Sequence, residues 1–124
     1  EETSKKMIKM LRRVVDKEDP LQGTARRADI NGYSIIGKTG TAIKPSKVSK
    51  GYSKDVMTVF ISAYPEEKPE YLLLVMIDEP KAIPSLGHFK SDSGWNAVPT
   101  AGNIIKKVGP ILASKNYTIA FNAK

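Results

Sequence analysis

The tract Gly37-Lys38-Thr39-Gly40-Thr41-Ala42 lies between the apolar pair Ile35-Ile36 and the breaker Lys44-Pro45. Its two glycines let a ligand or another chain approach the backbone closely. Its threonine hydroxyls can donate hydrogen bonds to an anion, and its lysine supplies a positive charge. Together these residue types indicate a segment that recognises a carboxylate or a phosphate, and the rest of the sequence must decide between the two.

The composition limits the classes of protein to consider. A chain of 124 residues supports one domain, which can bury roughly two thirds of its unfolded surface. With 20 Lys and Arg against 13 Asp and Glu, the net charge of +7 favours anionic surroundings without choosing among them. The chain has no cysteine, and His88 is its only histidine, so we expect no disulfide, no metal and no cofactor. The longest apolar run, residues 72–77, is too short to cross a bilayer.

The first half of the chain predicts one helix and one strand. Thr3 or Ser4 can cap a helix that Asp19-Pro20 stops. The apolar stripe of this helix consists of Met7, Ile8, Leu11, Val14 and Val15. Asn31-Gly32 is a tight-turn signal, and it opens a strand over residues 33–43.

The second half predicts a hairpin and a second helix. A loop over residues 44–54 leads to strands at 56–63 and 71–78, the latter wholly apolar and therefore expected to be central and covered on both faces. A long irregular loop over 79–94 follows, and Pro99 opens the last helix. The order α-β-β-β-α predicts an α+β fold, an antiparallel sheet of about three strands with the N- and C-terminal helices packed together on one face.

The glycine-rich tract also fits a nucleotide-binding motif. The segment that begins at Gly32 and ends at Thr39 satisfies the Walker A pattern, and the apolar strand before Asp78-Glu79 is similar to a Walker B strand that would hold Mg²⁺. A P-loop, however, follows a buried strand and leads directly into a helix whose N-terminal amides bind the phosphates. The residues before Gly32, at positions 26–31, do not form a buried strand, and Gly40 and Pro45 disfavour a helix. Nucleotide binding is therefore an alternative rather than the main prediction.

If the same tract forms a strand, it predicts a different kind of binding site. Alternation places Thr39 and Thr41 on one face and Lys38 and Gly40 on the other. At the edge of a sheet, such a strand leaves backbone N–H and C=O groups free to pair with an extended peptide. This arrangement is typical of a segment that binds a peptide ligand ending in a carboxylate.

With Lys38-Thr39-Gly40-Thr41, the chain resembles the transpeptidase domain of class B penicillin-binding proteins, whose third motif is Lys-Thr-Gly followed by Thr. The likeness runs from the Gly23-Thr24 connector, through the loop containing Tyr52 and the Asp78-Glu79-Pro80 turn, to the helix that begins around Ala97. It implies a fragment of the serine β-lactamase and penicillin-binding transpeptidase fold. It also implies a division- or elongation-type enzyme that cross-links peptidoglycan stem peptides through an acyl-serine intermediate and binds β-lactams.

The resemblance also implies a role for each residue of the motif. The Thr39 and Thr41 hydroxyls would hold the carboxylate of a stem peptide or a β-lactam, with Gly40 part of the same substrate-binding strand. Lys38 would bind substrate through its positive potential and steer proton movement, and the Thr41 backbone N–H would be one oxyanion donor. Lys38 and Thr41 are thus the expected catalytic residues.

The sequence also departs from the family pattern. It contains no Ser-x-x-Lys nucleophile motif, and Ser114-Lys115-Asn116 fits the family's Ser-x-Asn only downstream of the Lys-Thr-Gly. We therefore expect residues 1–124 to be the C-terminal portion of a transpeptidase domain, a single incomplete domain that is inactive alone. Its partners would be the N-terminal remainder of that domain and, through a missing anchor, the periplasmic face of the bacterial inner membrane.

A small basic nucleic-acid-binding module is the remaining alternative, because of the net charge. Apart from Tyr52, no aromatic residue interleaves the basic clusters, as base stacking requires. The main prediction therefore includes no nucleic-acid partner.

Overall fold

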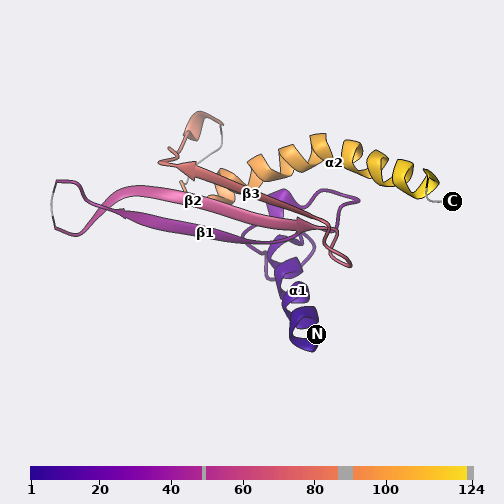
Figure 1. The fold of residues 1–124 in the computed structure, drawn as a ribbon. Helices are drawn as coiled ribbons and strands as arrows, with labels where there is room; N and C mark the ends of the chain where they lie inside the picture. The colour runs from indigo at the N-terminus through magenta and orange to yellow at the C-terminus, as the bar shows by residue number, and fades with distance from the viewer. Residues whose placement is uncertain (49, 87–90, 123–124) are drawn as a thin grey trace.

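The computed structural model describes residues 1–48, 50–86 and 91–122, with the side chains of the last helix described as far as position 115. The elements follow the predicted order α-β-β-β-α, with short 3₁₀ turns in the connections (Figure 1). They are α1 (Glu2–Val15), η1 (Arg26–Ala28), β1 (Ile36–Pro45), β2 (Tyr52–Tyr64), β3 (Tyr71–Asp78), η2 (Pro84–Leu86), η3 (Ser93–Trp95) and α2 (Ala97–Asn122).

The three strands form one antiparallel sheet in the order β1-β2-β3. The β1–β2 hairpin extends beyond the end of β3, and α2 lies along the sheet (Figure 1). This arrangement confirms the predicted α+β class, with a three-stranded antiparallel sheet and two helices. It also confirms that β2 and β3 form a hairpin.

The core lies on one face of the sheet. Thr58, Phe60, Ser62 and Tyr64 of β2 are all buried, because residues two apart on a strand share a face. Against them pack the small and aliphatic residues at the start of α2, which are Ala97, Val98, Ala101 and Ile105. This half of α2 therefore holds its place by hydrophobic burial on the sheet.

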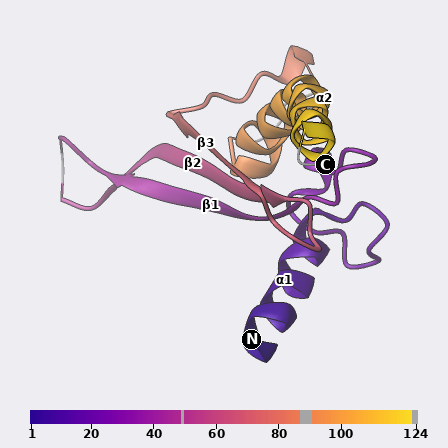
Figure 2. The same ribbon diagram turned by 45° about the vertical axis from the view of Figure 1, so that its right-hand side comes forward.

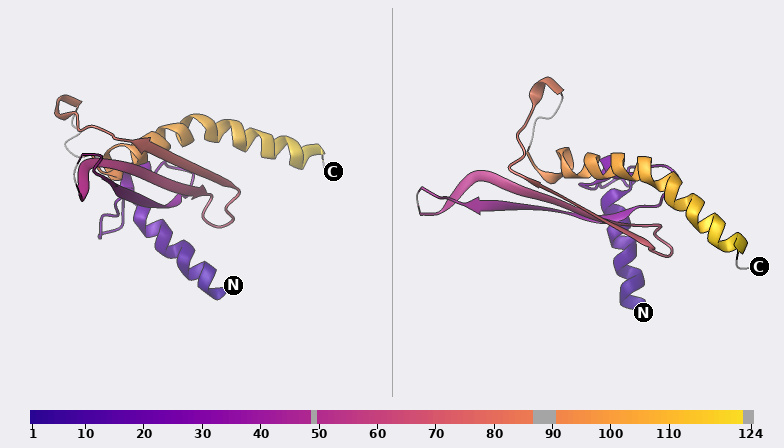
Figure 3. Two further views of the ribbon diagram at one scale, coloured as in Figure 1. Left: turned by 60° about the vertical axis from the view of Figure 1, so that its left-hand side comes forward. Right: turned by 45° about the horizontal axis from the view of Figure 1, so that its top comes forward.

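The helices are packed on each other less than the sequence predicts. Val15, at the end of α1, is fully buried and belongs to the same core cluster as the start of α2. From that point the two helices leave the sheet in different directions (Figures 2 and 3). Met7 is exposed and Ile8 is only half-buried, so the described residues cover the N-terminal half of the apolar stripe on α1 only in part.

The ends of α1 differ from the prediction. The helix begins at Glu2, so Thr3 and Ser4 lie inside it, and no side chain caps its first turn. It ends at Val15, before Asp19-Pro20. The cause is local, since Asp16 leaves the helical conformation and its carboxylate accepts the Glu18 N–H in a turn instead.

The first strand also starts and ends later than predicted. The turn at Asn31-Gly32 is confirmed, with Gly32 at φ +89°, but Ser34 also has a positive φ of +42°. Backbone in that region cannot join a sheet ladder, so β1 begins only at Ile36. At the other end, β1 continues to Pro45 and β2 begins at Tyr52. The loop between them is therefore shorter than the predicted loop over residues 44–54.

The prediction that residues 71–78 form a central strand is wrong within the described chain. β3 is an edge strand, and β2 is central because it pairs with both neighbours. Burial alternates along β3, and Leu72 is 70% exposed, with Leu74 and Met76 also exposed. Apolar composition alone did not distinguish burial on two faces from burial on one.

No helix in the described ranges has both the length and the apolar character needed to cross a membrane. The long helix α2 carries Lys106 and Lys107 near its middle.

An ion pair connects the end of α1 to the segment that leads into β1. Arg12 Nη1 donates to Asp29 Oδ1 and to the Ile35 carbonyl oxygen, both at 2.8 Å. The Lys17 N–H also donates to Asp29, at 3.1 Å. Burial raises the pKa of the Asp29 carboxyl, but the hydrogen bonds from Arg12 and Lys17 outweigh it and hold that pKa below its usual value.

We expect Asp29→Asn to lower the free energy of unfolding by about 1–2 kcal/mol at pH 7, because it removes the negative charge and one of the two acceptor oxygens of a hydrogen-bonded ion pair. Since the pKa of Asp29 is lower in the folded state, its stabilising contribution is present above its unfolded pKa of about 3.9 and is lost as pH falls through the folded value. The difference between parent and variant should therefore narrow below about pH 4. Urea unfolding of both chains between pH 7 and pH 2 measures it, and a difference that stays constant over this range would contradict the assignment.

Candidate functional site

The predicted motif lies on the edge strand β1. Thr39 and Thr41 are opposite Phe60 and Thr58 of β2. Directly opposed residues share a face, and Phe60 and Thr58 are fully buried, so the two threonines project on the core face of the sheet. Lys38 and the glycine after Thr39 take the other face, which confirms the predicted alternation. No strand of the described chain pairs with the second edge of β1.

Each threonine hydroxyl has a partner from a connecting segment. The Oγ1 atoms of Thr39 and Thr24 are 2.9 Å apart, and the Ser93 N–H donates to Thr41 Oγ1 at 3.4 Å. Sequence reasoning placed Thr24 in a connector without a role and gave Ser93 none. Both contacts join residues far apart in the chain, and no local sequence pattern indicates them.

Lys38 is exposed on the opposite side of the strand. Its Nζ donates to the Thr39 carbonyl oxygen at 2.9 Å. It borders a surface groove of about 410 Å³ whose other walls come from α1 and the connector after it. The ammonium group therefore lies at the motif and is open to an incoming ligand.

The two glycines of the tract differ in the space around them. A Cβ on Gly37 would lie 2.7 Å from the Ile61 carbonyl oxygen and 2.8 Å from the Phe60 ring, so the fold itself requires glycine there. At Gly40 the nearest atom to such a Cβ is 3.9 Å away, on Val59. The fold therefore does not require glycine at position 40, and the open space there lies on the same face as Lys38.

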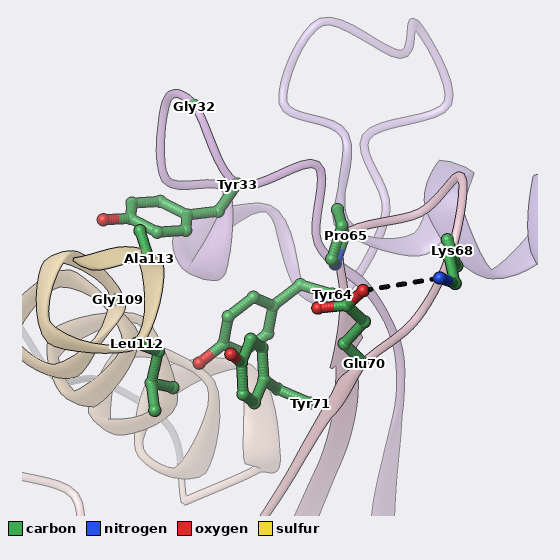
Figure 4. A pocket seen from close by; sticks show the side chains of 10 residues that line it. All are labelled: Gly32, Tyr33, Tyr64, Pro65, Lys68, Glu70, Tyr71, Gly109, Leu112 and Ala113. Atoms are coloured by element: carbon green, nitrogen blue, oxygen red, sulfur yellow. Dashed lines mark ion pairs between the residues drawn. The ribbon is translucent and has the colours of Figure 1, made fainter. Parts of the chain in front are cut away.

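A separate pocket of about 250 Å³ lies where the β2–β3 turn meets α2 (Figure 4). Tyr33, Tyr64 and Tyr71 line it, with the Tyr33 and Tyr64 rings packed edge to face at 6.0 Å. A Cβ on Gly109 would be 2.3 Å from the Tyr33 ring, so α2 passes closely here. No residue of the predicted motif lines this pocket.

The structure contradicts the Walker interpretation. Lys38 and Thr39 lie within a strand, whereas a P-loop needs a helix to begin there. Asp78 and Glu79 both pair with Lys44 Nζ, at 2.6 and 2.8 Å, which raises the pKa of that lysine. In the part of the chain that is described, no three His, Cys, Asp or Glu side chains cluster as a metal site would need. His88 lies outside the described residues.

An edge strand with two threonine hydroxyls on one face and an exposed lysine on the other matches the resemblance seen in the sequence. Residues 1–106 match the family model for the penicillin-binding protein transpeptidase domain. The chain belongs to the penicillin-binding protein transpeptidase family.

Relatives of this transpeptidase segment come from several bacteria. It is 35% identical over 124 residues to the probable peptidoglycan D,D-transpeptidase FtsI of Caulobacter vibrioides, covering 95% of this chain and 20% of the relative. It is 36% identical over 115 residues to the stage V sporulation protein D of Bacillus subtilis, covering 93% of this chain and 16% of that protein.

The fold agrees with solved structures of the same family. Penicillin-binding protein 3 of Mycobacterium tuberculosis, complexed with ampicillin, superposes with a TM-score of 0.71 at 28% identity, over 93% of this chain and 24% of that one. The transpeptidase domain of Burkholderia pseudomallei penicillin-binding protein 3 gives a TM-score of 0.67 at 30% identity, over 89% of this chain and 30% of that one. This chain thus spans between about a sixth and just under a third of the length of these four relatives.

Proposed function

We propose that this chain supplies the substrate-binding and oxyanion strand of a serine D,D-transpeptidase that cross-links peptidoglycan stem peptides and binds β-lactams. The observation that carries the proposal is the placement of Thr39 and Thr41 on one face of an edge strand whose second edge pairs with no strand of the described chain. The ampicillin complex of the M. tuberculosis relative supports β-lactams as ligands of this family.

The geometry fits recognition of a peptide carboxylate. An extended ligand can pair with the free edge of β1, and two hydroxyls on one face can donate to one carboxylate. Lys38 belongs to the same motif but projects on the other face of the strand. Its positive charge favours an anionic ligand. The Thr41 backbone N–H supplies one oxyanion donor, a contribution worth about 3 kcal/mol in other hydrolases.

The remaining parts of the reaction come from outside this chain. The sequence has no Ser-x-x-Lys, so the nucleophilic serine, its base and the acyl-serine intermediate belong to another part of the protein. Residues 1–124 are then one portion of a transpeptidase domain, and the rest of that domain is their partner. The complete enzyme works at the periplasmic face of the bacterial inner membrane.

We expect the isolated chain to carry no covalent label after incubation with a fluorescent penicillin and denaturation, because it lacks a nucleophile to acylate. The full-length protein should be labelled at a serine outside these residues. Gel fluorescence followed by peptide mapping measures both, and circular dichroism confirms that the isolated chain is folded. Stoichiometric labelling at any serine of the isolated chain would show that the nucleophile has been misplaced, and Ser34, Ser46, Ser49 and Ser53 would then be the candidates to map.

A further inference from the structure

The 3₁₀ turn η3 lies against the core face of the sheet at Thr41. The Ser93 N–H donates to Thr41 Oγ1 at 3.4 Å. A backbone N–H can only donate, so the threonine oxygen is the acceptor in this contact. The Thr41 hydroxyl proton is therefore left to point elsewhere, which is what donation to a ligand carboxylate requires.

Two buried hydroxyls attach this turn to β2. Ser93 Oγ donates to the Val59 carbonyl oxygen at 2.7 Å, and Thr58 Oγ1 donates to Asn96 Oδ1 at 2.7 Å. The Ser93 and Thr58 residues are 1% and 0% exposed, and Thr58 lies directly opposite Thr41 in the sheet. Both hydrogen bonds therefore reach β2 either at the residue opposite Thr41 or at the residue next to it.

Asn96 closes the turn on itself. Its Nδ2 donates to the carbonyl oxygens of Ser91 and Asp92, at 3.0 and 2.8 Å. Its Oδ1, which accepts from Thr58, also accepts the Ala97 N–H at the start of α2. The side-chain amide of Asn96 therefore connects the turn to β2 and to the first residue of α2 through hydrogen bonds.

A second contact fixes the outer side of the turn. The Arg27 guanidinium lies 3.9 Å from the centre of the Trp95 ring, and its Nη1 donates to the Gly94 carbonyl oxygen at 3.2 Å. Arg27 follows shortly after Thr24, whose hydroxyl contacts Thr39. The segments that contact the two site threonines are thus joined to each other.

We propose that Ser93 and Thr58 are positioning residues for carboxylate recognition: they hold the η3 turn so that Thr41 presents its hydroxyl proton to the ligand. The inference rests on the proposed role of Thr41 in binding a carboxylate. It assigns selectivity for carboxylate-bearing ligands to two buried side chains that do not touch the ligand.

The test compares acylation of the full-length transpeptidase by a penicillin and by the methyl ester of that penicillin. The ratio of the two second-order rate constants measures carboxylate recognition, and a general loss of folded protein does not change it. Ser93→Ala and Thr58→Val each remove one attachment, and each should lower the ratio about fivefold. Thr58→Ser keeps the hydroxyl and should stay within about twofold of the parent.

Ser62→Ala is the matched control. Ser62 is also 1% exposed, lies on the same face of β2 and donates to a backbone carbonyl, that of Leu73, but it does not touch the turn. Its removal should leave the acid-to-ester ratio unchanged. An equal fall in Ser62→Ala would mean that any buried hydroxyl on β2 has this effect, and it would overturn the inference.

Thr41→Val separates the inference from the function on which it rests. This variant should lower the ratio by about tenfold, because it removes the donor itself. If Thr41→Val lowers the ratio while Ser93→Ala and Thr58→Val do not, the positioning role is wrong and the proposed function stands. If Thr41→Val leaves the ratio unchanged, the proposed carboxylate site and the inference built on it both fail.

Discussion

Lys38→Ala in the full-length transpeptidase is expected to slow β-lactam acylation by about 100-fold or more, since it removes a positive charge that favours the ligand carboxylate and the proton path. The thermal midpoint should hardly change. Lys38 is exposed, and its described contact is a single hydrogen bond to the Thr39 carbonyl oxygen of its own strand. The second-order acylation rate and the thermal midpoint, measured on the same preparation, give both quantities.

Lys38→Arg is the matched variant, and it should recover part of the acylation rate. Arginine keeps the charge but spreads it over a planar fork, so it replaces a compact ammonium imperfectly. Parental acylation in Lys38→Ala, or a loss that merely follows unfolding, would mean that this strand has no catalytic role.

Gly37→Ala is expected to cost about 3 kcal/mol of stability, because its methyl group would meet the Ile61 carbonyl oxygen and the Phe60 ring at under 3 Å. Phe60 is fully buried in the core, so neither neighbour can move without disturbing the sheet. For a domain of this size the cost corresponds to a fall of about 10 °C in thermal midpoint. Thermal unfolding of the isolated chain measures it.

Gly40→Ala is the control for that substitution. It lies on the same strand, but its methyl group would find no atom nearer than 3.9 Å, so stability should change by less than about 0.5 kcal/mol. A large stability loss in Gly40→Ala, or none in Gly37→Ala, would contradict the conclusion that the fold requires glycine at position 37 but not at position 40.

Local sequence signals predicted most of the fold. The turn at Asn31-Gly32, the strand through Lys38 and the helix start near Pro99 all depend on residues close together in the chain, and the structure confirms each. The predictions are wrong where contacts between distant parts of the chain determine the structure. An apolar run such as residues 72–77 is equally compatible with a central strand and with an edge strand that has one exposed face.

The candidate site was predictable only in part. The alternation of Thr39 and Thr41 follows from the period of a strand, so the sequence predicts that they share a face. The hydrogen bonds between Thr24 and Thr39 and between Ser93 and Thr41 could not be predicted, because 15 and 52 residues separate the members of these pairs. Such contacts depend on how the connectors pack on the sheet, which no local pattern encodes.

If Thr39 and Thr41 bind the carboxylate of an acylating ligand, a crystal structure of the full-length protein acylated by a penicillin will show that contact. We expect the ligand carboxylate within about 2.5–3.0 Å of both threonine Oγ1 atoms. We also expect the carbonyl oxygen of the acyl group about 2.7–3.1 Å from the Thr41 backbone nitrogen. A ligand whose carboxylate lies away from both hydroxyls, with its acyl oxygen held by other donors, would contradict the roles proposed for these two threonines.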